Sequence, residues 1–269
     1  MIIGFGAKAG MIPLQAWLPT AHPVAPAPAS AVLSGIITKA GVLAIIRVIF
    51  YQVGTDMLRG TWVQYMLIIL ALTTVFVGSM LAFKEKLLKK RLAYSSVSQV
   101  SYVLFGLFLM TPASVEGALL QVVFHAIAKN ILFLCAGAII YKTHKTYVYE
   151  LRGIGKQMPI VMWCFTLASL SLVGIPPFAG FFSKFFVFMA AFHSGYYLIV
   201  FIALVNTIIS LYYYLLIVKA MFITPNEDPI GNFRTATPMR ISLLVCVAGI
   251  FVLGIISGVY QLLSDTSIL

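Results

Sequence analysis

Four lysines of this 269-residue sequence lie inside apolar stretches, where a charged side chain is costly. They are Lys8, Lys39, Lys129 and Lys184. On membrane-insertion scales, a lysine at the centre of an apolar helix costs roughly 2.5–3.5 kcal/mol. Burial and mutual repulsion both favour the neutral form of an amine, so such lysines can give and take protons near neutral pH. The pattern therefore indicates proton exchange between buried amines.

A polar stripe surrounds one of these lysines, in the stretch LLQVVFHAIAKNILFL. Gln121, His125 and Lys129 recur every four residues, so they share one face of an otherwise apolar helix. At this spacing neighbouring groups can exchange a proton directly or through one water. The stripe predicts a proton relay, and a set of purely structural polar groups is the alternative.

Two basic residues share the apolar run 31–51. Lys39 lies near its middle, in SGIITKAGVL, where small neighbours leave room for water and a lysine cannot easily reach the surface. We therefore expect an interior lysine in a hydrated pocket. Arg47 lies near the end of the run, and its side chain can reach the headgroups by snorkelling.

Proline and glycine interrupt the helical pattern next to the other two lysines. Lys8 precedes such a break in KAGMIPLQAWLP, and Lys184 follows one in SLVGIPPFAGFFSKFFVF. The breaks are marked by Pro13, Gly174, Pro176 and Pro177. Non-helical backbone inside a membrane must be buried in protein or line a cavity. Transporters use such breaks to expose carbonyls and helix ends, and a plain proline kink is the alternative.

Other polar residues carry weaker signals. Ser95, Ser98 and their polar neighbours at the start of one apolar run can support water, or can bond one helix to another. The acidic residues all lie in loops or near span ends, so no buried carboxylate neutralises the lysines. The cysteines and remaining histidines show no ligand spacing. We expect neither a metal nor a cofactor.

The elements that must position these residues are membrane-spanning helices. The chain is 61% hydrophobic and 9% charged, with a mean hydropathy of +1.03, which excludes a soluble domain. The expected fold is an all-α polytopic membrane helix bundle, with broken helices near Lys8 and at residues 174–177. Seven spans are predicted, at 31–51, 62–83, 92–110, 115–141, 160–192, 197–222 and 241–263, plus a partial one at the N-terminus. Only seven residues precede Lys8, so the chain is expected to be a fragment or shortened homologue that begins within a helix.

Basic residues alternate between the two sides of these spans. The net charge is +11, but the bases lie between spans, so a nucleic-acid partner is not expected. Loops 84–91, 142–157 and 223–240 are rich in Lys and Arg, whereas the intervening loops hold only Arg59. By the positive-inside rule the three basic loops are cytoplasmic, in a cell or other energy-transducing inner membrane.

Several stretches together resemble a known family. They are KAGMIPLQAWLPTAHPVAPAPASAVLSGIITKAG, KKRLAYSSVSQVSYVLFG, FHAIAKNILFLCAGAI, ELRGIGKQMP and GIPPFAGFFSKF, and they cover most of residues 8–186. The chain resembles the antiporter-like proton-translocating subunits of respiratory complex I, multisubunit Na+/H+ antiporters and membrane-bound hydrogenases.

That resemblance implies fourteen helices with two inverted five-helix repeats, of which this chain holds the part from the seventh helix onward. Residues 1–52 would be the tail of the first repeat, 61–222 the second repeat, and 241–269 the C-terminal helix. The family pairs its first-repeat lysine with a glutamate on the fifth helix, which this chain does not contain. A neighbouring polypeptide would then supply the missing N-terminal helices.

The resemblance also implies roles for individual residues. Lys8 is similar to the lysine of the first broken helix, and Lys39 to a bridging group on the eighth helix. His125 and Lys129 resemble the central relay, and Lys184 the terminal group near the exit. Gln121 stands where some members carry another histidine.

The function expected is proton translocation through buried Lys, His and water, driven by other membrane subunits of a larger complex. Any NADH:quinone oxidoreductase or hydrogenase activity would then belong to the whole complex. Cation/proton antiport with Na+ or K+ is the first alternative. A structural fragment that conducts nothing is the second.

Overall fold

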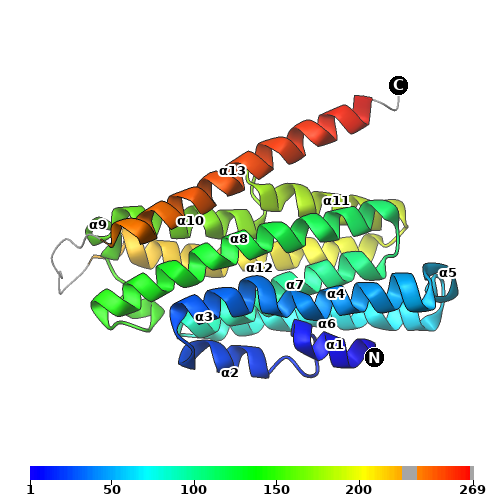
Figure 1. Cartoon of the computed structure of the whole chain (residues 1–269), viewed down its shortest axis with the longest axis horizontal. Coiled ribbons are helices and arrows are strands. Elements are labelled where there is room, and N and C mark those ends of the chain that lie inside the picture. The colour runs from blue at the N-terminus through cyan, green and yellow to red at the C-terminus, as the bar shows by residue number, and fades with distance from the viewer. Residues whose placement is uncertain (226–234, 267–269) are drawn as a thin grey trace.

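The computed structural model describes residues 1–225 and 235–266, with side chains to residue 260. Regular structure in these ranges is helical (Figure 1). The α-helices are α1 (Ile2–Ala9), α2 (Trp17–Val24), α3 (Ala27–Val32), α4 (Thr38–Ile46), α5 (Thr55–Leu58), α6 (Trp62–Lys84), α7 (Leu88–Phe108), α8 (Pro112–Thr143), α9 (Ile154–Gln157), α10 (Pro159–Val173), α11 (Ala179–His193), α12 (Tyr197–Phe222) and α13 (Thr237–Thr266). Part of the predicted loop 223–240 lies outside the described residues, with Glu227, Asp228 and Arg234.

Two π-helical turns extend α4 at its ends. The turn Leu33–Ile37 joins α3 to α4, and the turn Arg47–Val53 follows α4, so Ala27–Val53 is one continuous helix. A π-helical turn holds one extra residue between bonded backbone groups and often marks a functional position. The first of these turns ends directly before the segment that carries Lys39.

The predicted all-α membrane bundle is confirmed. Among the described residues five continuous helices are long and apolar enough to cross a membrane: Ala27–Val53, Trp62–Lys84, Pro112–Thr143, Tyr197–Phe222 and Thr237–Tyr260. The predicted span 160–192 is divided into the shorter apolar helices α10 and α11. The predicted span 92–110 is the serine-rich α7, and the partial N-terminal span is the pair α1 and α2.

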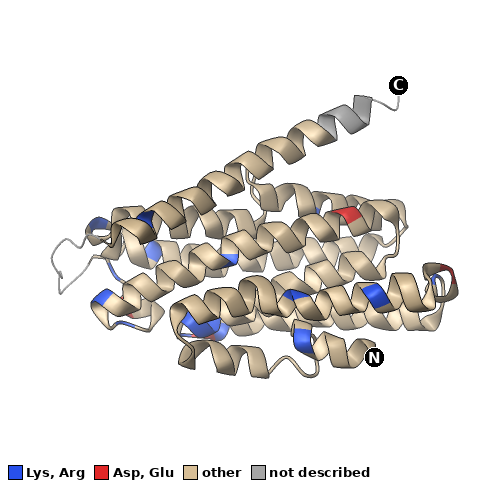
Figure 2. Ribbon diagram, in the orientation of Figure 1, with Lys and Arg blue, Asp and Glu red and all other residues tan. Residues whose placement is uncertain are grey.

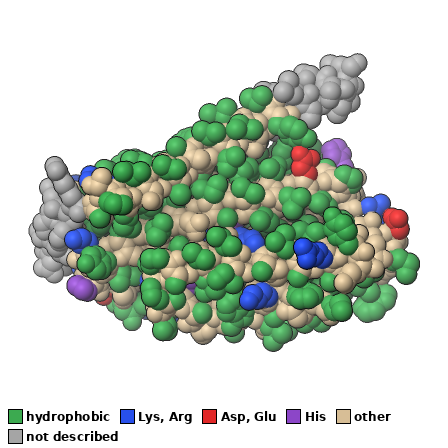
Figure 3. Space-filling model, viewed as in Figure 1, with side chains coloured by type: hydrophobic (Ala, Val, Ile, Leu, Met, Phe, Trp, Pro, Cys, Tyr) green, Lys and Arg blue, Asp and Glu red, His purple; other side chains and the backbone are tan. Residues whose placement is uncertain are grey.

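Helix α7 is the centre of the bundle, which explains its polar composition. Almost every residue from Arg91 to Phe108 is buried, and α7 packs against α6, α8 and α2. Its serines therefore meet other helices rather than lipid. The outer surface of the bundle, in contrast to α7, is mainly apolar: hydrophobic side chains are spread over the face shown in Figure 3. A surface of this kind suits the hydrocarbon core of a bilayer.

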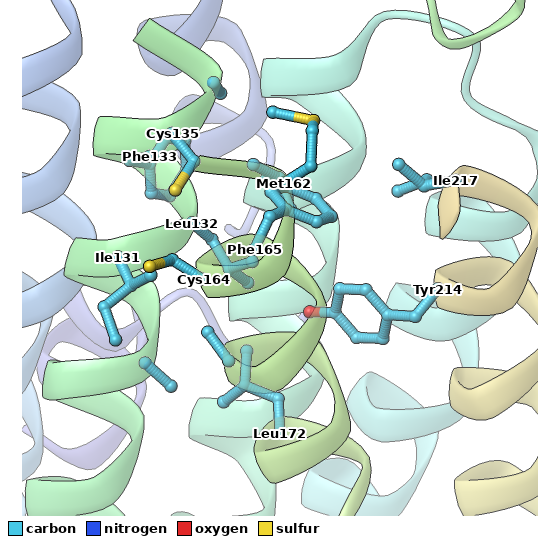
Figure 4. Close-up of a cluster of buried hydrophobic side chains, with 14 of the residues drawn as sticks. Ile131, Leu132, Phe133, Cys135, Met162, Cys164, Phe165, Leu172, Tyr214 and Ile217 are labelled. Carbon is cyan, nitrogen blue, oxygen red and sulfur yellow. The ribbon is translucent and has the colours of Figure 1, made fainter. Parts of the chain in front are cut away.

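The apolar core of the second half lies between α8, α10 and α12 (Figure 4). Leu132, Phe165 and Ile217 pack there, each fully buried. The thiol of Cys135 donates a hydrogen bond to the carbonyl of Val161 at 3.4 Å, which ties α8 to α10. This packing holds the two halves of the broken helix against α8.

Both helix breaks begin at a glycine in a left-handed conformation. Gly10, after α1, has φ of 89°, and Gly174, after α10, has φ of 94°. A side chain at such a φ is strained, so glycine is the natural residue to end these helices. The predicted break residues Pro13, Pro176 and Pro177 lie in the connections that follow, 10–16 and 174–178.

The basic connections lie together at one end of the molecule. The backbone N–H of Leu88 donates to Thr146 O at 3.0 Å, and Val148 N–H donates to Lys86 O at 2.9 Å. Gly153 N–H donates to Ala220 O, at the end of α12, at 3.1 Å. Figure 2 shows many of the Lys and Arg residues at this end, and the acidic positions of α5 and α8 toward the other. The loops that are rich in Lys and Arg in the sequence therefore lie at one end of the helix bundle, and the loops that are poor in them lie at the other.

Candidate functional site

The most direct contact between predicted site residues joins Lys39 of α4 to His125 of α8. Lys39 Nζ and His125 Nδ1 lie 2.6 Å apart, and the two side chains are 5% and 0% exposed. Lys39 Nζ also donates to the carbonyl of Ser34 at 2.5 Å. That carbonyl belongs to the π-helical turn before Lys39 and also accepts the hydroxyl of Thr38. The turn thus supplies the oxygen that anchors the amine.

Such an N···N contact restricts protonation, because one nitrogen must carry the hydrogen and the other must accept it. The ammonium of Lys39 can donate to an unprotonated Nδ1, or Nδ1–H can donate to a neutral amine. The contact cannot persist when Lys39 is an ammonium and Nδ1 also carries a hydrogen, so the protonation states of the two groups depend on each other. The second ring nitrogen, His125 Nε2, is buried and has no hydrogen-bond partner among the described residues.

One turn along α8, Lys129 is held by neutral oxygens. Its Nζ donates to the backbone carbonyl of Leu92 at 2.8 Å, to the hydroxyl of Ser95, and to Tyr214 Oη at 3.4 Å. Tyr214 in turn donates to Ser95 Oγ at 3.0 Å. Lys129 has no exposed surface. The amine therefore connects α8 with α7 and α12 inside the bundle.

Gln121 continues the stripe in the other direction along α8. Its amide donates to Gln99 Oε1 on α7 at 3.1 Å, and its Oε1 accepts the hydroxyl of Ser183 at 2.5 Å. Ser183 lies on α11 and is the neighbour of Lys184. The stripe on α8 is thus linked by hydrogen bonds to the second half of the broken helix.

Lys184 reaches across that break to the end of α10. Its Nζ donates to the carbonyls of Leu172 and Val173 at 2.6 and 2.9 Å. These are among the last carbonyls of α10, which have no intrahelical partner and lie at the negative end of the helix dipole. The ammonium also lies 5.0 Å from the centre of the Tyr102 ring, and Tyr102 accepts a hydrogen bond from Asn206 at 3.0 Å.

At the first break a tryptophan, rather than a lysine, donates a hydrogen bond to a carbonyl near the end of the preceding helix. The indole N–H of Trp17 donates to the carbonyl of Ala7 near the end of α1 at 2.7 Å. The backbone N–H of Ile12, inside the break, donates to Thr74 Oγ1 on α6 at 3.1 Å. At both breaks, therefore, a side chain from beyond the break donates a hydrogen bond to a carbonyl near the end of the preceding helix.

Lys8 departs from the expectation of a buried amine. It is exposed, on a short helix whose main contact is with α4. Its stem lies over Gly41, where an added Cβ would come within 3.0 Å of Lys8 Cβ. Because α1 packs on α4 and, to a smaller extent, on α7, the amine of Lys8 on its other side is exposed. Arg47 is likewise exposed, as a snorkelling residue should be.

Ser98 bonds one helix to another, which is one of the two uses that its position in the sequence allowed. Its hydroxyl donates to Val75 O at 3.0 Å and pairs with Ser79 Oγ at 2.8 Å, both on α6. Residues three apart lie near one face of a helix, but α7 is buried on all sides, so the two serines can meet different helices. Ser95 contacts Lys129, whereas Ser98 joins α7 to α6.

Sequence reasoning missed several residues that complete the site. They are Ser34, Tyr102, Ser183, Asn206 and Tyr214. Tyrosine and serine are common in membrane helices, so composition alone does not mark these positions. A usable signal existed only for Ser183, which precedes Lys184. Asn206 and Tyr214 lie on α12, and their contacts with the site depend on how the helices pack, so the sequence does not predict them.

The arrangement is a set of buried amines and one imidazole with neutral partners. In the described part of the chain, none of the hydrogen bonds of Lys39, Lys129 and Lys184 goes to a carboxylate. The described residues also contain no group of three or more His, Cys, Asp or Glu side chains that could hold a metal ion. A helical membrane bundle with two broken helices and titratable groups in its interior is the construction of a membrane transport protein.

Comparison with known proteins identifies the family of membrane proteins to which this chain belongs. Residues 1–210 match the family described as NADH:quinone oxidoreductase/Mrp antiporter, TM, and the chain belongs to this family. The resemblance read from the sequence motifs is thereby confirmed.

Individual relatives give the same family and reveal a difference in length. The chain is 52% identical over 267 residues to NADH-quinone oxidoreductase subunit N of Phocaeicola vulgatus, covering 99% of this chain and 56% of that protein. It is 33% identical over 261 residues to F(420)H(2) dehydrogenase subunit N of Methanosarcina mazei, covering 94% and 52%. A chain of the membrane-bound sulfane sulfur reductase, an archaeal respiratory membrane complex, superposes with a TM-score of 0.86 at 27% identity, covering 99% and 54%. The chain spans about half the length of the curated relatives it matches.

Proposed function

We propose that this chain translocates protons across a membrane as part of a larger complex. The observation that carries the proposal is the contact between Lys39 and His125, 2.6 Å apart and buried in the bundle. A structural cation would be expected to pair with an acid or to reach water. Here the amine lies within hydrogen-bond distance of an imidazole, and such a contact allows a proton to pass from one group to the other.

The proposed pathway runs along the stripe on α8 and ends at the broken helix. From Lys39 the proton passes to His125 and then to Lys129, one turn along α8, where Cβ atoms four residues apart are about 5–6 Å from each other. One bridging water closes such a distance. Ser95 supports Lys129 by hydrogen bonding, and Gln121 connects the stripe to α11 without itself titrating.

Lys184 is proposed as the last group of this pathway. The carbonyls at the end of α10 stabilise its protonated form through the helix dipole, and a shift of α11 relative to α10 would remove that stabilisation. The amine could then release its proton toward the side opposite the basic loops. Repulsion between neighbouring cations passes each change in protonation along the row.

The complex itself is a proposal drawn from the relatives. One relative is named as a subunit of NADH-quinone oxidoreductase and another as a subunit of F(420)H(2) dehydrogenase. We therefore propose that other subunits of a complex supply the driving force, and that any redox chemistry belongs to the whole complex. The two broken helices support a division into the tail of one repeat, residues 1–52, and a second repeat, residues 61–222. Residues 241–269 then form the C-terminal helix.

Lys8 would join the pathway only where other helices cover α1. We propose that such a cover exists in the complex, since the relatives are about twice as long as this chain. In that setting Lys8 would lie at a break between two packed halves, as Lys184 does here.

The test is proton uptake by inverted membrane vesicles that contain the whole complex. Lys129→Ala and Lys184→Ala should each lower H+ uptake by about tenfold or more, because a missing relay group interrupts the chain. Lys142→Ala is the matched control, since Lys142 is an exposed lysine at the end of the same helix, and uptake should remain normal. Immunoblots check that each variant assembles.

Three results would oppose the proposal in different ways. Normal uptake in both Lys129→Ala and Lys184→Ala, with normal assembly, rejects the relay and leaves a structural fragment. Uptake that disappears when choline replaces Na+ and K+ identifies cation/proton antiport instead. Loss of uptake in Lys142→Ala would show that charge alone, rather than position, is responsible.

A further inference from the structure

A second feature, unrelated to the lysine row, is a cavity of about 370 Å³ at the basic end of the molecule. Three cations line it: Lys86 from the connection after α6, Arg91 from the first turn of α7, and Arg152 from the connection before α9. The remaining wall includes the apolar side chains of Val148, Leu216 and Ala220. The cavity is therefore basic and apolar at once.

Arg91 is the most informative of the three cations, because it is almost fully buried at 7% exposure. Its Nε donates to Glu85 O at 2.8 Å and its Nη2 donates to Phe83 O at 3.4 Å. Its Nη1 is buried and has no hydrogen-bond partner among the described residues. A buried guanidinium with unused donors is costly unless an acceptor is supplied.

Nearby carboxylates do not supply that acceptor. Glu85 forms an ion pair with Lys90 at 2.9 Å and accepts the backbone N–H groups of Lys86 and Leu87. Burial raises the pKa of the Glu85 carboxyl, but these hydrogen bonds and the charge of Lys90 outweigh burial and leave the pKa below its usual value. Glu150 accepts the backbone N–H groups of Thr146 and Tyr147 at 2.9 Å. Both acids are already bound to local partners.

The position of the cavity indicates the kind of anion. Arg91 lies in the first turn of α7, and Leu216 and Ala220 lie near the end of α12, so the cavity is at the depth where a helix leaves the hydrocarbon core. Phospholipid phosphates occupy that depth, with acyl chains directly below. Basic pockets between helices on the cytoplasmic side are suited to anionic lipid headgroups, and arginine binds phosphate through paired N–H groups.

We propose that this cavity binds the phosphate of an anionic phospholipid. Arg91 at the floor and Lys86 and Arg152 at the mouth contact the phosphate oxygens, while the glycerol and upper acyl chain lie against Leu216 and Ala220. The proposal is independent of proton translocation.

The experiment compares lipid binding by native mass spectrometry of the full chain in detergent, with dioctanoyl phosphatidylglycerol, dioctanoyl phosphatidylcholine and inorganic phosphate as probes. The test variant is Lys86→Gln with Arg152→Gln, because Arg91 also holds the end of α6 and its loss could unfold the protein. The matched control is Lys84→Gln with Lys142→Gln, two exposed lysines outside the cavity lining.

Phosphatidylglycerol should bind the wild type and the control variant equally, and more tightly than phosphatidylcholine. Each cation near a lipid surface is worth about fivefold in affinity, so the test variant should bind phosphatidylglycerol about 25-fold more weakly. Equal binding of the two lipids, or unchanged binding by the test variant, would overturn the proposal.

Two further outcomes identify another occupant and also overturn it. Inorganic phosphate that saturates the wild type at the same concentration as phosphatidylglycerol would indicate a site for a free anion. A test variant that keeps its lipid affinity in this assay, but no longer copurifies with partner subunits from the membrane, would indicate that the cavity binds an acidic segment of a protein.

Discussion

At the scale of single residues, the buried amines have neutral partners in place of carboxylates. Lys39 has an imidazole and a carbonyl, Lys129 a carbonyl and two hydroxyls, and Lys184 two carbonyls. A carboxylate would hold each lysine permanently in its charged form. Neutral acceptors stabilise the ammonium less strongly than a carboxylate would. In the proposed pathway, these neutral partners are what would allow the lysines to exchange protons.

A substitution that keeps the positive charge tests whether Lys39 exchanges protons. Lys39→Arg keeps the cation, but a guanidinium does not release its proton at any physiological pH. Proton uptake by the assembled complex should fall by about 10²-fold, the lower range for losing an acid–base group. Arg47→Lys, on the same continuous helix but exposed, should leave uptake unchanged. If Lys39→Arg assembled and pumped normally, Lys39 would be a fixed charge and the relay would have to omit it.

At the scale of elements, carbonyl groups at a helix break stabilise the charge of a buried lysine, a role that an acidic side chain would otherwise have. An intact helix uses its carbonyls internally, whereas the end of α10 offers two of them to Lys184 in the interior of the bundle. The two half-helices must therefore stay in close contact. Gly180 allows this, because a Cβ at that position would overlap the backbone carbonyl of Ser171 on α10.

Gly180→Ala should therefore separate α10 from α11. We expect a loss of about 1–3 kcal/mol in stability, as for an overpacked core, together with a loss of proton uptake because Lys184 is displaced from its carbonyls. Gly249→Ala in α13 is the control, since a Cβ there meets nothing within 4 Å and alanine favours the helix. Unfolding midpoints in detergent give the comparison. Equal midpoints for the two variants would mean that the contact of Gly180 with α10 is not tight.

At the scale of the whole molecule, charge is divided between the two ends of the bundle. The connection after α6, the connection after α8 and the end of α12 are hydrogen-bonded to one another, and Lys and Arg gather there (Figure 2). Helix α5 with Asp56 lies at the opposite end (Figure 1). Because positively charged loops are retained in the cytoplasm, we propose that the end with α9 is cytoplasmic.

Labelling with a membrane-impermeant maleimide tests this orientation. Lys156→Cys in α9 should react in inverted vesicles, and Asp56→Cys in α5 should react in right-side-out vesicles, since both residues are exposed. Cys246, which is half-buried, is replaced by alanine to lower the background, whereas Cys135 and Cys164 are buried. The reverse labelling pattern would place the basic end outside and would reverse the proposed direction of proton release.

The sequence alone determined the helical membrane architecture, the break positions and the identity of most titratable groups. These follow from local properties: apolar runs set the helices, proline and glycine end them, and a four-residue repeat places Gln121, His125 and Lys129 on one face. Lysine in an apolar run is rare enough to mark a site without any knowledge of neighbouring helices.

Only the tertiary structure decided which groups meet. The pairing of Lys39 with His125, the carbonyls offered to Lys184 and the hydroxyl of Tyr214 join residues distant in the chain, and no local pattern specifies how helices pack. The same limit explains why Ser98 faces α6 and why Lys8 is exposed. A helix has several faces, and which one a side chain presents to its neighbours is set by the packing of the whole bundle.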